Sequence, residues 1–388
     1  MALLIKSLFK LTKFFTLTLL ILVIAVAAWV WVTHPKPVDM ATDVPADAKI
    51  YIEVNNFPDI IRGLYSTSVI SRTKSVNQSW LAKAGPWLDR FTAWTGIGSA
   101  ESVLLSRAQL AVYVSGLEAN SNSESIEMQP RVCILIETHT NESRSQKVFE
   151  KYAGDLINAL LTRPVLKKFD KKFERDAAHY YYWTSADNRQ IIGVVKGSLI
   201  LIGNDESAVQ ACLDVNRQTR PTLAPTLANN PELEEMRLRV HGERSAVFGF
   251  TTPEGSSQLA QAAILTTING LVSDADQQRL VVSIASQLAN NAIRNSAWSS
   301  SFSNSAVEDH YYVALNKVVA SHLTSPQTST DNFAEFKKAT EILPAKFYSV
   351  THYNYLEPKK VWRSLNSAIS TQLETFSAIA VSSFLDAA

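Results

Sequence analysis

Three strands follow one another closely in the stretch HYYYWTSADNRQIIGVVKGSLILIG, residues 179–203. Residues 179–184, 190–196 and 198–203 are rich in β-branched and aromatic side chains, as strands usually are. The last two meet at Lys196-Gly197-Ser198, which predicts a tight hairpin. A hairpin joins antiparallel neighbours, so this stretch predicts an antiparallel sheet.

The flanking sequence mixes helices with strands. Asn204-Asp205 is a helix cap before 205–216, and Pro221, Pro225 and Pro231 indicate a linker-like crossing. Periodicity predicts further strands at 49–54, 109–115, 131–137, 245–250, 297–303, 309–317 and 346–352, and further helices at 78–94, 143–161, 256–292 and 333–341. This order indicates an α+β fold, antiparallel-rich and mixed, rather than a doubly wound sheet.

An uncharged run, FFTLTLLILVIAVAAWVWV, extends from Phe14 to Val32 without Gly or Pro. Its nineteen residues would span roughly 28 Å as a helix, close to the hydrocarbon thickness of a bilayer. Residues 14–32 are therefore predicted to be a transmembrane signal anchor that contacts the lipid bilayer. Its representative membrane residues are Phe14, Leu20, Val26, Trp29, Trp31 and Val32.

The flanking charges predict the orientation of this anchor. Lys6, Lys10 and Lys13 precede it within residues 1–13, and acidic residues follow it. By the positive-inside rule, residues 1–13 are cytoplasmic. The chain is thus predicted to be a single-pass protein of the inner (plasma) membrane, with its C-terminal part, residues 33–388 (the ectodomain), in the periplasm or outside.

A cleaved signal peptide is the alternative interpretation of the same run. Ala25-Val26-Ala27 has the small-x-small form of a cleavage site. Cleavage there would leave an apolar start, AWVWV, exposed to water, which favours the retained anchor. Both interpretations export the ectodomain.

The ectodomain is nearly neutral. It carries 36 acidic and 34 basic residues, a net charge of about −2. Nucleic-acid binding needs a basic face, so no nucleic-acid partner is expected. It contains only two cysteines, Cys133 in a strand-like run and Cys212 in a helix-like run. An exported protein can pair them as a disulfide, or they can be two buried free thiols.

Two segments of the ectodomain are similar in sequence. Residues 33–47 contain three prolines and are predicted to be a tether before an α+β unit at 48–341. Residues 44–71 and 343–370 share a Pro-Ala strand opening, a helix-opening proline and an Ile-Ser end. This predicts a repeat, with 343–388 the start of a second related unit, although two generic strand–helix units can look alike. Because the apolar end 379–388 lacks a cap, we expect truncation there.

The anchor, the Pro-Ala strand opening, GSLILIGNDESAVQACL and LPAKFYSVTHYNYL together resemble a bacterial family, domain of unknown function 3352. The resemblance spans most of the ectodomain through architectural motifs. It implies a membrane-anchored extracytoplasmic protein of bacteria. The family implies no activity and no catalytic residues.

Motifs for common chemistry are missing from the sequence, including G-x-S-x-G, H-E-x-x-H, the P-loop and C-x-x-C. The ectodomain histidines are not spaced for a helical metal pair, so strand-edge packing is favoured over a metal site. Besides His34 in the tether, they are His139, His179, His241, His310, His322 and His352.

Three further groups have a functional interpretation beside a structural one. The run Tyr180-Tyr181-Tyr182-Trp183 could stack on sugars, or pack in the core. The basic stretch 167–175 could lie on anionic lipid, or be a solvated face with Phe169 and Phe173 turned inward. Ser256-Ser257 and Ser115 have no base nearby in sequence, so a nucleophilic role is not expected.

These observations leave two classes of function open. The first is a non-enzymatic binding, scaffold or assembly module of the cell envelope, with envelope proteins or polysaccharide as partners. The second is an envelope hydrolase with an unrecognised active site. The missing motifs and the repeat favour the first class. We therefore expect no catalytic, cofactor-binding or metal-binding residues, and no cofactor.

Overall fold

The computed structural model describes residues 20–25, 36–55, 92–96, 98–121, 126–160, 170–184, 190–216, 225–268, 275–303 and 306–323, with short pieces within 363–379 and a few single residues. The chain divides into two compact units that interleave along the sequence. The first contains Met1–Ser115, Pro130–Gly249 and Trp298–His310, and the second contains Gly116–Gln129, Phe250–Ala297 and Tyr311–Ala388. The predicted boundary between 341 and 343 lies outside the described residues.

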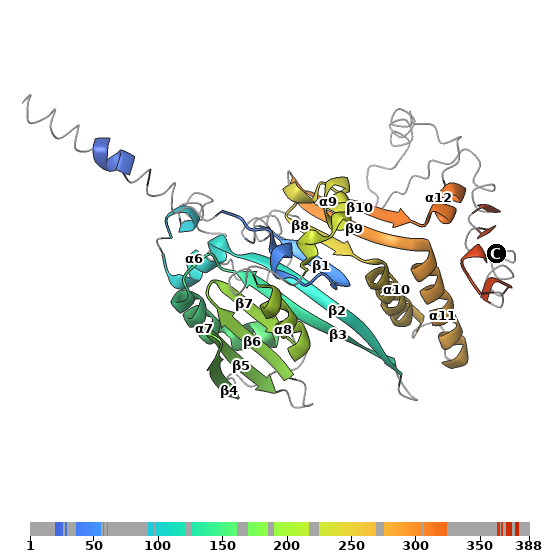
Figure 1. The fold of residues 1–388 in the computed structure, drawn as a ribbon, viewed down its shortest axis with the longest axis horizontal. Coiled ribbons are helices and arrows are strands. Elements are labelled where there is room, and N and C mark those ends of the chain that lie inside the picture. Colours follow the sequence, from blue (N-terminus) through green and yellow to red (C-terminus); the bar gives the residue numbers. More distant parts are fainter. Residues whose placement is uncertain are drawn as a thin grey trace, which may run out of the picture. The chain divides into compact units, whose positions relative to one another are not determined.

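The strands form one ten-stranded sheet in the order β10-β9-β8-β1-β2-β3-β7-β6-β5-β4 (Figure 1). Strand β1 pairs antiparallel with β2, β3 with β7, and β4 to β7 pair antiparallel in succession. The predicted α+β class with a large antiparallel sheet is confirmed. The strands are β1 Ile50–Val54, β2 Gln109–Ser121, β3 Ile126–Glu137, β4 Lys171–Arg175, β5 Ala178–Thr184, β6 Gln190–Lys196, β7 Leu199–Gly203, β8 Val247–Thr251, β9 Ile293–Ser303 and β10 Ala306–Leu315.

Two tight turns set the register of the β4–β5 pair and of the β6–β7 pair. Lys196 pairs with Leu199, so Gly197-Ser198 is the two-residue turn of the predicted β6–β7 hairpin. Gly197 has φ 59°, a conformation that glycine adopts without steric cost. The β4–β5 turn, Asp176-Ala177, also has positive φ at both residues, 51° and 56°, without a glycine.

Helices cover both faces of strands β3 and β5 to β7. Helix α7, Glu142–Leu160, places Phe149 against Tyr181 and Trp183 on one face. Gly193 makes this approach possible, because a Cβ there would lie 2.4 Å from Phe149 Cζ. Since side chains alternate along strands, the opposite face receives helix α8, Glu206–Val215, whose Val209 packs over Gly203. Helix α7 was predicted from helical spacing and α8 from its cap, and Asp205 is the residue that caps α8.

The remaining elements of the first unit surround these layers. They are η1 Met40–Asp43, α6 Ala100–Arg107, η2 Leu227–Asn229, α9 Pro231–Arg239 and η3 Gly242–Arg244. The prolines at 225 and 231 were expected in a linker. Instead Pro231 is the first residue of α9, where its fixed φ suits a helix start, and Asn230 caps the helix.

The second unit contains a helical pair. Residues 256–292, predicted as one long helical stretch, form helices α10 Pro253–Ile268 and α11 Ala275–Ala292, which pack against each other. Helix α12, Lys317–Leu323, follows β10. The predicted elements at 333–341 and 346–352 lie outside the described residues, as does most of the predicted repeat.

The predicted anchor is described only in part. Residues 20–25 and Ala28 are helical, whereas Phe14, Val26, Trp29, Trp31, Val32 and the three orienting lysines lie outside the described residues. Within the part of the chain that the structure describes, we find no helix with the length and apolar character of a membrane span.

Candidate functional site

The segment that follows the apolar run is folded. Asp39 caps η1, because its Oδ1 accepts a hydrogen bond from the Ala41 N–H at 3.1 Å. Met40, Ala41 and Val44 have no exposed surface. Residues 40–45 of the tether expected at 33–47 are therefore packed, whereas Lys36 and Pro37 before them are exposed.

A second chain segment holds this one in place. Leu227 N–H donates to the Val44 carbonyl at 2.8 Å, and Ala46 N–H donates to the Pro225 carbonyl at 3.2 Å. Between these bonds, Pro45 and Thr226 form an isolated antiparallel bridge. Residues 44–46 and 225–227 thus behave as a short two-stranded contact within the first unit.

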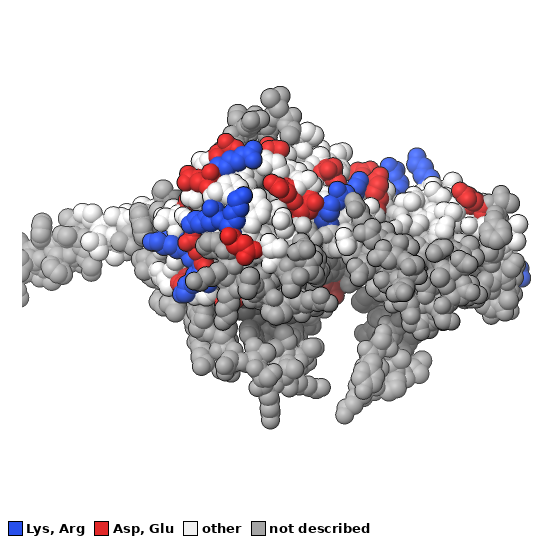
Figure 2. Space-filling view, turned by 90° about the horizontal axis from the view of Figure 1, so that it is seen from below, with Lys and Arg blue, Asp and Glu red and all other residues white. Residues whose placement is uncertain are grey.

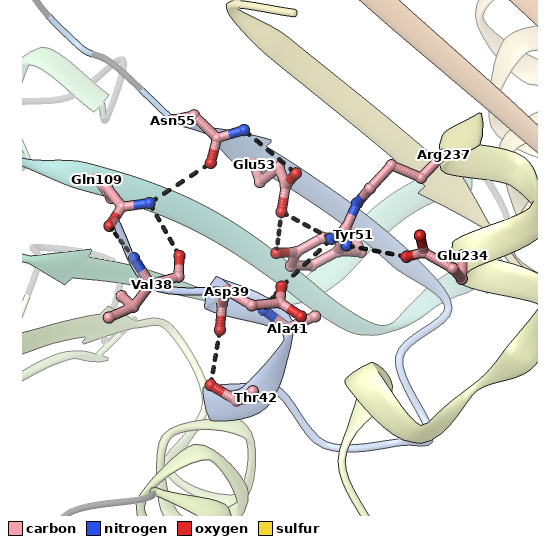
Figure 3. Close-up of polar contacts among 10 residues, drawn as sticks. All are labelled: Val38, Asp39, Ala41, Thr42, Tyr51, Glu53, Asn55, Gln109, Glu234 and Arg237. Carbon is pink, nitrogen blue, oxygen red and sulfur yellow. Dashed lines mark hydrogen bonds and ion pairs between the residues drawn. The ribbon is translucent and has the colours of Figure 1, made fainter. Parts of the chain in front are cut away.

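A buried ion pair lies beside this contact (Figure 3). Glu53 on β1 accepts a hydrogen bond from the Tyr51 hydroxyl at 2.7 Å and another from Arg237 Nη2 at 3.1 Å. The side chains of Glu53 and Arg237 are 4% and 11% exposed. Arg237 Nη2 also lies 3.3 Å from Asp39 Oδ1, and Nη1 lies 3.4 Å from Glu234 Oε2. The guanidinium therefore links η1, β1 and α9.

A side-chain amide makes the other attachment. Gln109 Oε1 accepts from the Val38 N–H at 2.8 Å, and Gln109 Nε2 donates to the Val38 carbonyl at 2.9 Å (Figure 3). The amide thus forms both bonds that a neighbouring strand residue would form. Asn55 joins the two attachments, because its Oδ1 accepts from Gln109 and its Nδ2 donates to Glu53, each at 3.4 Å.

His139 completes the network at the end of β3. Its Nε2 lies 2.8 Å from Gln109 Oε1, and its N–H donates to Glu137 Oε1 at 2.9 Å. Because an amide oxygen only accepts, Nε2 must carry the proton in this pair. His139 has φ 49°, a left-handed backbone conformation that is uncommon outside glycine. Arg107 Nη1 donates to its carbonyl at 3.3 Å.

We call one set of these residues the N-terminal clamp: Asp39, Tyr51, Glu53, Gln109 and Arg237. The electrostatic surroundings of the clamp favour one fixed charge state for its side chains. Burial raises the pKa of Tyr51, and the charge of Glu53 and its hydrogen bond raise it further. Burial lowers the pKa of Arg237, but Glu53, Asp39 and other acidic neighbours outweigh this, so its pKa is raised. Tyr51 is therefore a neutral donor and Arg237 a permanent cation.

This arrangement is suited to holding the chain rather than to chemistry. A general base needs a lone pair that can reach a substrate. The Glu53 carboxylate instead accepts from Tyr51, Arg237 and Asn55, and it is buried. Within the described residues no three His, Cys, Asp or Glu side chains are placed to hold a metal ion.

The histidines are spread over the first unit. His179 Nε2 lies 3.3 Å from Glu142, and His310 Nε2 lies 3.3 Å from Glu308. The rings of His241 and His310 meet edge to face with centroids 5.5 Å apart. The His322 side chain and His352 lie outside the described residues.

The aromatic run on β5 packs on both faces of the sheet. Tyr181 and Trp183 belong to the core under α7. On the other face, Phe173 stacks on Tyr180 and Tyr182 with centroids 5.1 and 5.8 Å apart. The faces of these rings are in contact with one another, so the geometry favours packing over stacking on a sugar.

The basic stretch is partly a strand. Residues 171–175 form β4, in which Phe173 packs on Tyr180 and Tyr182, whereas Phe169 lies outside the described residues. Lys171 lies over the Phe173 ring, 5.0 Å from its centroid, and Lys172 pairs with Glu150. Figure 2 shows basic and acidic side chains interspersed on one face of the described surface.

The serines and cysteines sit in structural surroundings. Ser256 contacts the Thr251 hydroxyl at 2.6 Å, and Thr251 contacts Ser296 at 2.7 Å, which is a hydroxyl chain without a base. Cys133 and Cys212 are both buried free thiols.

Sequence reasoning missed the pairing of Glu53 with Arg237. A signal existed for one partner, because Glu53 is a charged residue inside the apolar strand KIYIEV, on the same face as Tyr51. No signal marked Arg237, which lies among other charged residues of α9, 184 positions away.

The fold and the clamp define an α+β protein with a large antiparallel sheet and a docked N-terminal segment. Comparison with models of protein families, with curated proteins and with solved structures finds no match to this chain. The resemblance to domain of unknown function 3352 therefore stays a prediction.

Proposed function

We propose that this chain is a single-pass protein of the bacterial inner membrane, related to domain of unknown function 3352. Its ectodomain acts as a non-enzymatic binding, scaffold or assembly module of the cell envelope. The observation that carries this proposal is the clamp on residues 38–46. A flexible linker would not require buried side chains directly after the anchor.

The apolar helix supports the anchor. Leu20, Ile21, Leu22, Val23 and Ile24 are helical, and each side chain is 55–59% exposed. Burying an aliphatic side chain stabilises by about 1.5–3 kcal/mol, so moving five half-exposed ones into lipid is worth roughly 5 kcal/mol. A bilayer supplies that environment.

The clamp then sets how far the ectodomain stands from the membrane. Only residues 33–37 separate the predicted anchor from Val38, and a fully extended chain of this length spans roughly 20 Å. The first unit is thus held close to the membrane surface, where it can position a partner of the envelope. Scaffold and assembly proteins need such fixed placement.

The location is tested on the full-length protein expressed in a bacterium. We expect it to stay in the membrane pellet after alkaline carbonate washing, and to be digested by protease only once the outer face of the membrane is accessible. The variant Leu22→Arg/Ile24→Arg places two charges in the apolar run, each costing about 3 kcal/mol in a membrane. It should leave the pellet, whereas the control Thr33→Arg should remain. Retention of both variants would overturn the proposal.

The module's role is tested by affinity capture from the native membrane. Bait lacking the clamp, through Arg237→Met, is compared with the matched surface variant Arg239→Met. We expect a specific envelope protein or polysaccharide on wild-type and Arg239→Met bait, with less on Arg237→Met. Turnover of an envelope polymer by purified protein would instead establish the hydrolase.

A further inference from the structure

The two cysteines of the ectodomain meet across two elements of the first unit. Cys133 lies on β3 and Cys212 on α8, 79 positions apart in the sequence. Both side chains are fully enclosed, and Cys133 is among the neighbours that raise the pKa of Cys212. The fold therefore brings together two thiols that are distant in the sequence, instead of burying each in a separate place.

The packing around them fixes this approach. Cys133 pairs directly with Gly203 in the β3–β7 register. Helix α8 rests on that glycine, since a Cβ there would lie 2.5 Å from Val209 Cγ2. Cys212 follows Val209 by three residues and so lies on the same helix face. The absence of a side chain at residue 203 therefore lets α8 bring Cys212 over the strand that carries Cys133.

In the folded protein the Cys212 thiol is a poor nucleophile, and both thiols are enclosed. Burial raises the pKa of Cys212, and the hydrogen bond with Cys133 and the charges of Asp43 and Asp47 raise it further. Thiol–disulfide exchange requires the thiolate and access to it. Oxidation must therefore occur before α8 closes on the sheet.

We propose that Cys133 and Cys212 are joined by a disulfide formed during folding of the exported ectodomain. A protein or small-molecule disulfide is the oxidant. One thiolate attacks it to give a mixed disulfide, and the second thiolate displaces the carrier. An S–S bond forms between Cys133 and Cys212, and the oxidant's S–S bond breaks. The two electrons and two protons that the cysteines lose convert the oxidant to two thiols. The expectation that the ectodomain meets an oxidising compartment rests on the proposed function, whereas the approach of the two cysteines does not depend on it.

The chemistry is tested by refolding the denatured full chain in detergent with mixed oxidised and reduced glutathione. The product is unfolded again with an alkylating agent and weighed by mass spectrometry. We expect no alkylation before reduction and two alkyl groups after it. Two alkylatable thiols in the refolded protein would overturn the inference.

Stability gives a second readout. A bond closing a loop of this length should raise the thermal midpoint by roughly 10 °C, and a reductant present during unfolding should abolish the increase. The Cys133→Ala/Cys212→Ala variant should show no response to reductant. An equal response in wild type and variant would contradict the disulfide.

Alkylating the protein in the living cell before extraction reports whether its two cysteines are oxidised there. This measurement tests the disulfide and the proposed location separately. We expect the disulfide there as well. If refolding forms the bond but the cellular protein carries free thiols, the cellular part of the inference fails and the proposed exported location fails with it. If refolding fails to form the bond, only the disulfide is refuted.

Discussion

Replacing Arg237 by methionine removes the guanidinium that faces the buried carboxylate of Glu53. Methionine keeps the length and apolar contact of the arginine stem, so the change mainly deletes charge. Glu53 keeps the Tyr51 hydrogen bond at 2.7 Å but loses the cation at 3.1 Å. A buried carboxylate without its counter-ion must then be solvated or protonated.

The magnitude follows from how deeply the pair is enclosed. Breaking a buried ion pair by removing one partner costs roughly 3–5 kcal/mol. Because Arg237 retains some exposure and its bond to the half-exposed Asp39 adds little, we expect about 3 kcal/mol for Arg237→Met. Glu53→Gln leaves Arg237 with two exposed carboxylates and should cost about 1–2 kcal/mol. The double variant should cost about 2–3 kcal/mol, less than the sum, with a coupling of about 2 kcal/mol.

The assay is urea unfolding of the full-length protein in detergent, with hydrogen exchange of residues 38–48 as a local readout. Arg239→Met is the control, because Arg239 is on the same helix and its pair with Glu235 is over half exposed at both ends. Its effect should stay within about 0.5 kcal/mol. If both arginine variants cost the same, or if the double-variant coupling is near zero, the clamp is not a stabilising unit.

Three other variants or conditions test the packing and charge states. Gly193→Ala should cost about 2 kcal/mol in denaturant unfolding, since the new methyl lies 2.4 Å from Phe149, and Phe149→Leu should recover part of it. Ala177→Gly should add about 0.5–1 kcal/mol, because Ala177 has φ 56°; a loss of stability would contradict that turn. Burial and neighbouring acidic residues raise the pKa of Tyr51 and Tyr113, so their stabilising contribution is complete below the unfolded pKa near ~10 and is lost as pH rises above it. Thermal melts across this range, with tyrosinate absorbance, should show ionisation together with unfolding; ionisation of the folded protein would refute the enclosure.

Strands and helices with strong local patterns were predictable. The β6–β7 hairpin follows from Gly197 and two apolar runs, and α7 from residues at helical spacing. Both depend on interactions between residues close in sequence. Strand β4 was missed, because KKFER is too charged to show alternation and becomes a strand only by pairing with β5.

The packed state of residues 38–46 was missed for a related reason. Prolines and a lack of periodicity resemble a tether when only neighbours in the sequence are considered. The segment is ordered by distant partners, which supply the hydrogen bonds that a tether would take from water. These partners are Gln109, Pro225, Leu227 and Arg237.

Composition and periodicity alone indicated an α+β class, antiparallel hairpins, a nearly neutral ectodomain and an apolar run long enough for a bilayer. These properties depend on local side-chain chemistry, which needs no knowledge of partners. The contact of Glu53 with Arg237, and that of Cys133 with Cys212, exist only in the tertiary structure. The order β8-β1-β2 and the packing of α8 on Gly203 bring these residues together, and burial then turns ordinary side chains into an ion pair and a thiol pair.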